Sequence, residues 1–473
     1  MISLTIGHWI SLAATLAVIL AVTVYSTRSV RSAVEFSLCG RSSGAMLIAG
    51  GISGTCIGGS ATIGTAQMAY SYGLSAWWFT MGEGLGLIVL AAFYAYPLRK
   101  SGLETLPQYL GRHYGGLAGP LTSLISSLGI LFSAVASVLS GIAMVELVFG
   151  MASWQAAALI ISMVVACVCV GGLKGAGVSG LLKMGVLWVT LFAAGAVATL
   201  ALGRMPDFDA LFPAFPWFSP IARGLPDCLG NVASLIVGMI CTQTYIQAVY
   251  SASDTKVAAV GTLVAAAITI PVGLPSVAIG MVMHVTHPDI KPILALPMYL
   301  VLHLPAWLGG IGLAGILFSI VGSVAGLALG IGTMLANDIG RNLFHVTGEG
   351  RILGINRLAV LAVTILATLI ALSNANSYVL DWNYMSMALR GGGVFVPMTL
   401  AIFWPRRLSA FWAVLSMAAS TVVAVVGRFG LDWPVNPLFT ALAVSLMVVG
   451  VGLVVGLAGQ GIRDAGRVDE PSV

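Results

Sequence analysis

The sequence predicts an all-α integral membrane protein with about thirteen transmembrane helices, and three observations support this fold class. Of its 473 residues, 59% are hydrophobic and 8% are charged, whereas a soluble domain carries roughly 25% charged residues. Apolar runs of the roughly 20 residues needed to cross a bilayer follow one another along almost the whole chain. Glycine is abundant, at 58 residues, as is typical where helices pack closely in lipid or are interrupted.

The expected spans lie between charged or Pro/Gly-rich breaks. Their approximate limits are 6–26, 44–70, 74–98, 117–148, 152–171, 178–203, 228–250, 258–284, 306–336, 356–373, 377–404, 408–428 and 435–458. The first run has no basic segment before it and no clear cleavage site after it. We therefore expect it to be a retained span rather than a signal peptide.

Lysine and arginine predict the orientation, because the basic residues of short loops stay on the cytoplasmic side. With the N-terminus outside, fifteen of the 21 basic residues fall in inside segments, four fall outside, and Lys183 and Arg390 lie within spans. We expect a multi-pass protein of the cell (inner) membrane with a cytoplasmic C-terminus. The net charge of +5 follows from this topology, and no basic patch suggests a nucleic-acid partner.

Several other classes of protein lack their sequence signals here. No Walker-type phosphate loop is present, which disfavours ATP-driven transport. The six cysteines lie in or beside apolar runs without metal-type spacing, so we expect them to be packing residues. No nucleophile–base pair or metal cluster is evident, and we expect neither an enzyme nor a bound cofactor.

Span 44–70 contains the segment IAGGISGTCIGGSATIG, in which glycine and hydroxyl residues occur all around the helix. An interrupted helix survives in lipid only where protein or a solvated cavity covers its unpaired backbone groups. Its freed carbonyls then become ligands for ions and small polar solutes. The alternative is that these small residues only allow close helix packing.

A second interruption is expected in span 228–250, where the polar segment TQTYIQ follows Gly238. Two interrupted helices five spans apart are what an inverted repeat of two transporter halves predicts, with a substrate site between them near the midplane. Span 306–336 adds small residues on one face, which suit either packing or an ion-lining surface. These residues are Ser319, Gly322, Ser323 and Gly326.

Six segments carry a family resemblance that extends over nearly the whole chain. In chain order they read SAVEFSLCGRSSG, SGLETLPQYLGRHYG, GGLKGAGVSGLLKMG, TQTYIQAVYSASD, LAGILFSIVGSVAG followed by LANDI, and GVFVPMTLAIFWPRR. In their order and spacing they resemble the sodium:solute symporter family, which includes proline, pantothenate, sialic acid and sodium–glucose symporters. Each segment alone is weak evidence for the family, whereas the full series in this order is specific to it.

The resemblance implies a five-plus-five inverted-repeat core that works by alternating access driven by an ion gradient. Residues 1–43 would hold a peripheral first span and a cytoplasmic loop. Residues 44–203 would form the first repeat with spans 2–6, and residues 204–404 the second with spans 7–11. Residues 405–473 would add peripheral spans 12 and 13 and a cytoplasmic tail.

The resemblance also implies a core sodium site, built from carbonyls at the first interruption and from span 306–336. The positions that match it are Ala49, Ile52, Ser319, Gly322 and Ser323. Gly322 stands where the family usually has a second hydroxyl residue. The resemblance still implies a Na⁺ ion, held by Ala49, Ile52, Ser319 and Ser323.

Lys183 marks a second departure from the family. The family has an aspartate close to the ion where this chain has Ser179 and Gly180, and Lys183 lies one helical turn further along. Its ammonium could replace the sodium, donating to the carbonyls of Ala49 and Ile52 and to Ser323. The coupling ion would then be H⁺ instead of Na⁺. Alternatively, Lys183 snorkels to the cytoplasmic headgroups or pairs elsewhere.

Glu83 and Arg390 are the other charges expected deep in the membrane, where ionisable residues are functional candidates. Both lie among glycines, which leave room for a partner or a ligand. Arg390 could bind a substrate carboxylate through its planar fork, or it could pair with Glu83.

The family's sugar transporters place carboxylate, amide and aromatic residues at positions that correspond here to Thr55, Cys56, Leu235, Gly238 and Met239. None of these could bind several hydroxyls, so the resemblance implies that a sugar is not the substrate. A small amino acid or organic carboxylate fits these positions better. The expected substrate-binding residues are Ser53, Thr55, Cys56, Gln243, Tyr245 and Arg390.

The sequence therefore predicts a secondary active symporter that imports a small polar solute. Its partners would be that small molecule and the lipid bilayer, and we expect it to act as a monomer. The alternative is a membrane solute sensor that transports weakly or not at all. Accumulation of the solute above its outside concentration would distinguish the two.

Overall fold

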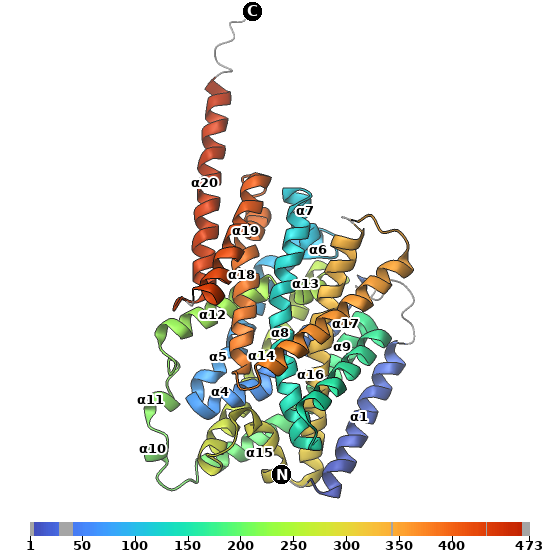
Figure 1. Cartoon of the computed structure of the whole chain (residues 1–473), viewed down its shortest axis with the longest axis vertical. Coiled ribbons are helices and arrows are strands. Elements are labelled where there is room, and N and C mark those ends of the chain that lie inside the picture. The colour runs from blue at the N-terminus through green and yellow to red at the C-terminus, as the bar shows by residue number, and fades with distance from the viewer. Residues whose placement is uncertain (1–3, 28–40, 342–343, 432, 466–473) are drawn as a thin grey trace, which may run out of the picture.

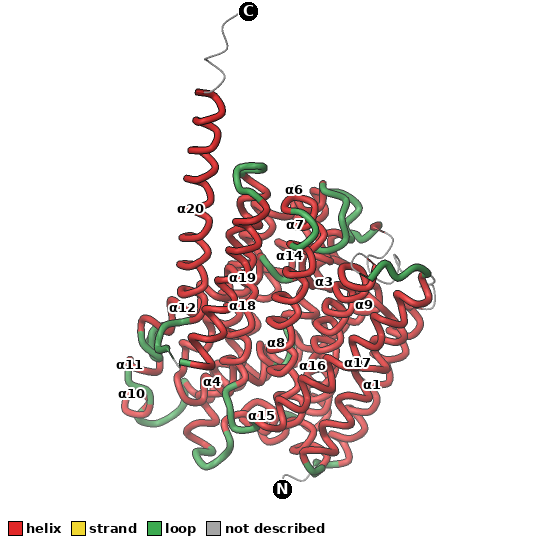
Figure 2. The backbone as a smooth tube through the Cα atoms, turned by 45° about the horizontal axis from the view of Figure 1, so that its top comes forward, coloured by secondary structure: helices red, strands yellow, loops and turns green. Residues whose placement is uncertain are grey.

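The computed structural model describes residues 4–27, 41–341, 344–431 and 433–465. Part of the predicted loop segment at 32–44, the basic residues Arg28, Arg31 and Arg467, and the end of the tail lie outside the described residues. Within the described part of the chain, all regular structure is helical (Figure 2), and Ser43 and Ala252 form an isolated β-bridge. The predicted fold class is confirmed.

The helices of the first half of the chain occupy the following ranges. They are α1 Ile6–Thr27, α3 Ala45–Cys56, the π-helix η2 Ser60–Gly64, α4 Thr65–Tyr72, the 3-10 helix η3 Gly73–Trp77, α5 Trp78–Val89, the π-helix η4 Leu90–Tyr94, α6 Ala95–Lys100, α7 Leu106–Tyr114, α8 Ala118–Phe149 and α9 Ser153–Leu202.

The second half follows the same all-helical pattern. Its elements are α10 Phe208–Leu211, α11 Ala214–Trp217, α12 Leu225–Ile240, α13 Gln243–Tyr250, α14 Thr255–Thr286, the 3-10 helix η5 Pro292–Leu294, α15 Ala295–His303, α16 Ala306–Met334, the π-helix η6 Leu335–Arg341, α17 Glu349–Ser373, α18 Val379–Phe403, α19 Ala410–Val425, the π-helix η7 Val426–Gly430 and α20 Pro437–Ala465.

The helices divide into a buried centre and an outer layer (Figure 1). Most residues of α8, α12, α16 and α18 are covered by other helices, whereas most of α19 and α20 is not. Small residues allow this close packing in lipid, and α16 in particular is built largely of glycine, alanine and serine. The interrupted helices α3 and α12–α13 lie within the centre, where protein covers their open backbone groups.

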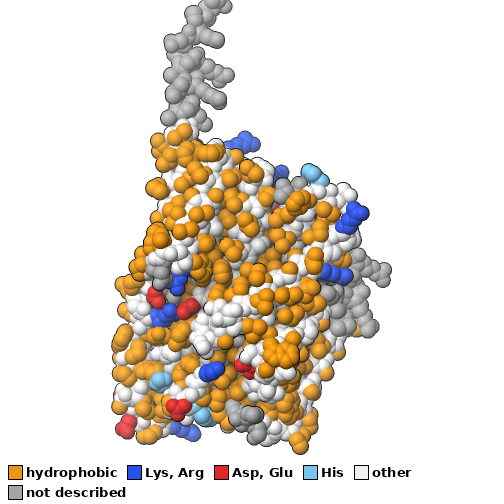
Figure 3. All heavy atoms as spheres, viewed as in Figure 1, with side chains coloured by type: hydrophobic (Ala, Val, Ile, Leu, Met, Phe, Trp, Pro, Cys, Tyr) orange, Lys and Arg blue, Asp and Glu red, His pale blue; other side chains and the backbone are white. Residues whose placement is uncertain are grey.

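Ten helices of the described residues are long and apolar enough to cross a bilayer, and shorter apolar helices such as α3 accompany them. Figure 3 shows hydrophobic side chains over most of one face of the molecule, with few charged side chains among them. Such a surface suits contact with lipid. The total of about thirteen spans stays a prediction.

One predicted boundary is not seen. The sequence separates spans 152–171 and 178–203, but the structure joins both in α9, a helix of 50 residues. The segment between them is rich in glycine and contains no proline. Glycine lowers helix stability without removing a backbone donor, so it does not by itself end the helical hydrogen bonding.

Candidate functional site

Helix α3 ends in the middle of the protein, as its glycine-rich sequence predicts. Its last residue is Cys56, and Ile57 leaves the helical region with φ −85° and ψ 81°. Two glycines follow that bring other helices close. A Cβ on Gly58 would lie 2.4 Å from the hydroxyl of Ser323 on α16, and one on Gly59 would lie 2.5 Å from a side chain of α8. The first predicted interruption is confirmed, and α8 and α16 pack directly against it.

Two serines of α16 bind carbonyls that this interruption frees. The Ser323 hydroxyl donates to the carbonyl of Thr55 at 2.9 Å, and the Ser319 hydroxyl donates to the carbonyl of Ile57. Both serines are buried. Because the last carbonyls of a helix have no partner within it, these side chains satisfy groups that would otherwise be unpaired.

Lys183 reaches the same place from α9. Its side chain is 1% exposed, and its ammonium donates to the carbonyls of Gly54 and, at 3.1 Å, of Ser319. A Cβ on Gly322 would lie 3.1 Å from the ammonium nitrogen, so the glycine at this position leaves room for it. The snorkelling alternative is wrong, because the ammonium is buried where α3, α9 and α16 meet. We call this meeting point the Lys183 junction.

The ammonium contacts a later part of α3 than the sequence analysis expects. Ala49 and Ile52 lie within the regular part of the helix, and the carbonyl of Ala49 also accepts from the Ser53 hydroxyl at 2.6 Å. Helical bonding occupies carbonyls in that stretch, whereas those near the end of the helix lose their partners. The acceptors of Lys183 are therefore the carbonyls of Gly54 and Ser319, in place of Ala49, Ile52 and the Ser323 side chain.

The second interruption separates α12 from α13, as predicted. Thr242 has an extended backbone, with φ −83° and ψ 115°, and its hydroxyl donates to the carbonyl of Gly238 at 2.6 Å. Gly238 also allows close packing, because a Cβ there would lie 2.6 Å from Cβ of Met387 on α18.

The structure brings together only some of the predicted substrate-binding residues. Cys56, the last residue of α3, and Tyr245, in the first turn of α13, are both buried and lie within electrostatic range of each other, so side chains from the two interruptions lie in the same region. Gln243 instead accepts from the backbone N–H of Leu106 at 2.8 Å and so holds the start of α7. The hydroxyl of Thr55 donates to the carbonyl of Gly51, within its own helix.

Arg390 is fully buried, and its donors are held by groups from three helices. Its Nη1 donates to the Thr242 hydroxyl at 2.8 Å, and its Nη2 to the hydroxyls of Ser133 at 2.9 Å and Ser386 at 2.6 Å. Its Nε donates to the carbonyl of Ser386 at 3.2 Å. The guanidinium thus ties the second interruption to α8 and α18, and no ion pair joins it to Glu83 within the described ranges.

Glu83 lies on α5 and is 2% exposed. Its Oε2 atom is buried and has no hydrogen-bond partner among the described residues. The carboxylate is within electrostatic range of Arg390, Cys56 and Tyr245, so it belongs to the region between the two interruptions.

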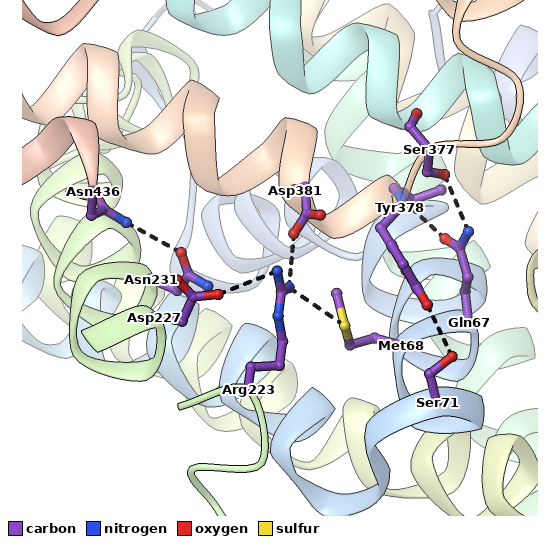
Figure 4. Close-up of polar contacts among 11 residues, drawn as sticks. Gln67, Met68, Ser71, Arg223, Asp227, Asn231, Ser377, Tyr378, Asp381 and Asn436 are labelled. Atoms are coloured by element: carbon purple, nitrogen blue, oxygen red, sulfur yellow. Dashed lines mark hydrogen bonds and ion pairs between the residues drawn. The ribbon is translucent and has the colours of Figure 1, made fainter. Parts of the chain in front are cut away.

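A pocket of about 160 Å³ lies beside Arg223, which precedes α12. Arg223 donates to Asp381 on α18 at 2.8 Å, and an oxygen of Asp227 lies 3.4 Å from its other terminal nitrogen (Figure 4). Although desolvation opposes the charge, the carboxylate of Asp381 raises the pKa of Arg223. Tyr384 lines the same pocket, which we call the Arg223 pocket.

The residues that hold Arg390 were not predicted from the sequence. Ser386 precedes Arg390 by four residues, so helical spacing could have placed it on the same face. Ser133 and Thr242 come from α8 and from the second interruption, and no local pattern relates them to Arg390.

Comparison with known proteins gives a consistent result. The sequence profile of the sodium:solute symporter family matches residues 36–417. The high-affinity choline transporter 1 of Homo sapiens is 25% identical over 413 residues, covering 80% of this chain and 69% of the relative. The Drosophila melanogaster protein of the same name is 26% identical over 372 residues, covering 74% of this chain and 59% of the relative, which is less than two thirds of its length.

Solved structures show the same fold. A Na⁺-coupled sialic acid symporter in a substrate-bound outward-open state superposes with a TM-score of 0.79 at 18% identity, covering 96% of this chain and 98% of that one. A nucleobase-cation-symport-1 family transporter in a closed conformation gives a TM-score of 0.58 at 12% identity, with 88% and 93% covered.

Proposed function

The chain belongs to the sodium:solute symporter family, and from this premise we propose that it imports a small polar solute by ion-coupled alternating access. The solute would bind between the two interruptions, near Cys56 and Tyr245. The observation that carries the proposal is that two helices, α3 and α12–α13, are both interrupted in the buried centre, beside Cys56 and Tyr245.

The Lys183 junction supports a proton as the coupling ion. The ammonium already donates to the carbonyls of Gly54 and Ser319, and a sodium ion at these oxygens would be within a few ångströms of a second positive charge. When Lys183 carries its proton, it holds α3, α9 and α16 together. When it releases the proton, these hydrogen bonds lose their charge and the helices can separate.

Sodium coupling is the alternative that the family favours. It would use the carbonyls of Ala49 and Ile52 with Ser319 and Ser323, as the family resemblance implies. Lys183 would then have to lose its proton or move away when the ion binds, since like charges in a medium of low dielectric repel strongly.

The solute class is supported from two directions. The residues near the interruptions suit a small amino acid or organic carboxylate better than a sugar. The two relatives described above are named as choline transporters, which supports a solute with a positively charged end. An amino acid satisfies both, because it carries an ammonium group as well as a carboxylate.

Uptake by proteoliposomes tests the proposal. Purified protein would be supplied with labelled choline, proline and lactate, under a sodium gradient at equal pH or under a pH gradient without sodium. We expect accumulation under the pH gradient, and loss of that accumulation in Lys183→Gln. Lys256→Gln is the matched control, because Lys256 is exposed in the first turn of α14.

Each result has a distinct meaning. Uptake driven by sodium alone at constant pH, and retained in Lys183→Gln, would reject proton coupling through Lys183 and leave the symporter assignment intact. Absence of accumulation under both gradients, together with specific solute binding, would favour the sensor alternative.

A further inference from the structure

The Glu83 carboxyl group is in an unusual environment for an ionisable side chain. The side chain is 2% exposed, and its Oε2 has no hydrogen-bond donor among the described residues. Buried carboxylates are costly unless they are paired or hydrogen-bonded, and most buried polar atoms in proteins have a partner. An open acceptor in this position therefore points to a group supplied from outside the chain.

Close packing keeps Glu83 where it is. Helix α5 meets α12 and α14 through glycines on either side of the glutamate. A Cβ on Gly84 would lie 2.2 Å from the side chain of Ile270, and one on Gly86 would lie 2.7 Å from Cβ of Met239. These contacts leave little freedom for the helix to turn, so the carboxylate cannot escape to lipid headgroups.

Arg390, the buried positive charge nearby, is in the opposite state. Its Nε and both terminal nitrogens already donate to Ser133, Thr242 and Ser386. A substrate carboxylate would have to displace these hydroxyls before it could accept two hydrogen bonds from the guanidinium. Of these two buried ionisable side chains, only Glu83 has a buried polar atom without a hydrogen-bond partner among the described residues.

The surroundings of Glu83 suit an organic cation. Tyr245, Cys56 and Tyr384 lie within electrostatic range of the carboxylate. Phe79, one turn earlier on α5, meets the ring of Tyr384 edge to face at 5.9 Å and 72°, and Tyr384 lines the Arg223 pocket. Aromatic rings bind ammonium groups through their electron-rich faces.

We propose that Glu83 receives the positively charged end of the transported solute, and that the substrate is a small molecule bearing an ammonium group. The inference rests on the proposed transport function and adds the residue that selects the solute. The carboxylate pairs electrostatically with the cationic head of the solute, whose positive charge offsets the cost of a buried carboxylate that no donor of the described residues neutralises.

Equilibrium binding to purified protein in detergent tests this without any ion gradient. The probes are choline and 3,3-dimethyl-1-butanol, a neutral molecule in which carbon replaces the nitrogen of choline. We expect the wild type to bind choline tighter than the neutral molecule by about tenfold or more, because a buried charge pair distinguishes them. Glu83→Gln should lose most of this difference, and Glu83→Asp should recover part of it.

Glu146→Gln serves as the control, because Glu146 lies near the end of α8 and is only partly buried. It should bind both probes as the wild type does. Thermal unfolding of each variant separates a lost binding site from a protein that does not fold, and recovery in Glu83→Asp provides a second check.

The inference is overturned if the wild type does not bind choline, if it binds the neutral molecule equally well, or if folded Glu83→Gln keeps the preference. None of these results bears on gradient-driven uptake itself. A protein that accumulates a neutral or anionic solute would retain the proposed function and lose this assignment.

Discussion

At the scale of single residues, three hydroxyl groups determine what the charge of Arg390 does. Ser133, Thr242 and Ser386 occupy the guanidinium from three directions, so it braces the second interruption. Arginine suits this position because its planar fork presents several donors at fixed angles. A lysine would keep the charge but could not reach all three groups with the same geometry.

We therefore expect Arg390→Lys to lower the free energy of unfolding by about 1–3 kcal/mol, because buried hydroxyls would lose their donor. Thermal unfolding of the purified protein in detergent measures this. Arg407→Lys, in the exposed segment after α18, should change stability by less than about 0.5 kcal/mol. Equal stability of Arg390→Lys and wild type would show that the three hydroxyls do not need the fixed donor geometry of the guanidinium.

Gly58 gives a second prediction at this scale. Its missing Cβ lets α16 approach the end of α3, where an added methyl group would lie 2.4 Å from the Ser323 hydroxyl. Gly58→Ala should lower the free energy of unfolding by about 1–3 kcal/mol through overpacking. It should reduce the uptake rate more than it reduces the amount of folded protein, since Ser323 binds a carbonyl at the interruption. Gly185→Ala on α9 has no neighbouring atom within 4 Å and should transport normally.

At the scale of elements, the ion pair between Arg223 and Asp381 connects the segment before α12 to the first turn of α18 (Figure 4). Both side chains are partly exposed, and such pairs contribute at most about 1 kcal/mol. The pair is thus too weak to hold the fold together. It is well placed to influence how far the Arg223 pocket opens.

Asp381→Asn should therefore leave thermal stability almost unchanged and make the pocket more accessible. The measurement is the rate at which a hydrophilic maleimide labels Tyr384→Cys, in a background that also carries Cys228→Ser. We expect a several-fold faster reaction, since about 1 kcal/mol corresponds to a factor of five. Exchanging the two charges, with Arg223→Asp and Asp381→Arg, should restore the slower rate, and equal rates in all three proteins would contradict the idea.

The helix elements also show which features can be read from sequence. Dense glycine and hydroxyl residues predicted the first interruption, because they weaken a helix and tolerate irregular backbone. The polar segment TQTYIQ after Gly238 predicted the second. The same reasoning failed at 172–177, where glycines occur and α9 nevertheless continues. Local composition shows where a helix can break, and packing against neighbouring helices decides whether it does.

At the scale of the whole molecule, the distribution of lysine and arginine predicts a cytoplasmic C-terminus. Green fluorescent protein fused after α20 should fluoresce, and alkaline phosphatase fused at the same point should be inactive, because each folds on only one side of the membrane. The reverse pair of results would invert the predicted orientation of every span. The division into two repeats at 44–203 and 204–404 stays a prediction.

The sequence alone determined the membrane class, the two broken helices and the presence of Lys183, Glu83 and Arg390 inside apolar spans, because hydropathy, glycine content and charges inside apolar runs are local properties. Only the tertiary structure decided what these charges contact. Lys183 donates to carbonyls of Gly54 and Ser319, Arg390 is occupied by hydroxyls, and Glu83 keeps an open oxygen. Apart from Ser386, which lies one turn from Arg390 on α18, the partners of Lys183 and Arg390 are far from them in the chain, and helix packing brings them together.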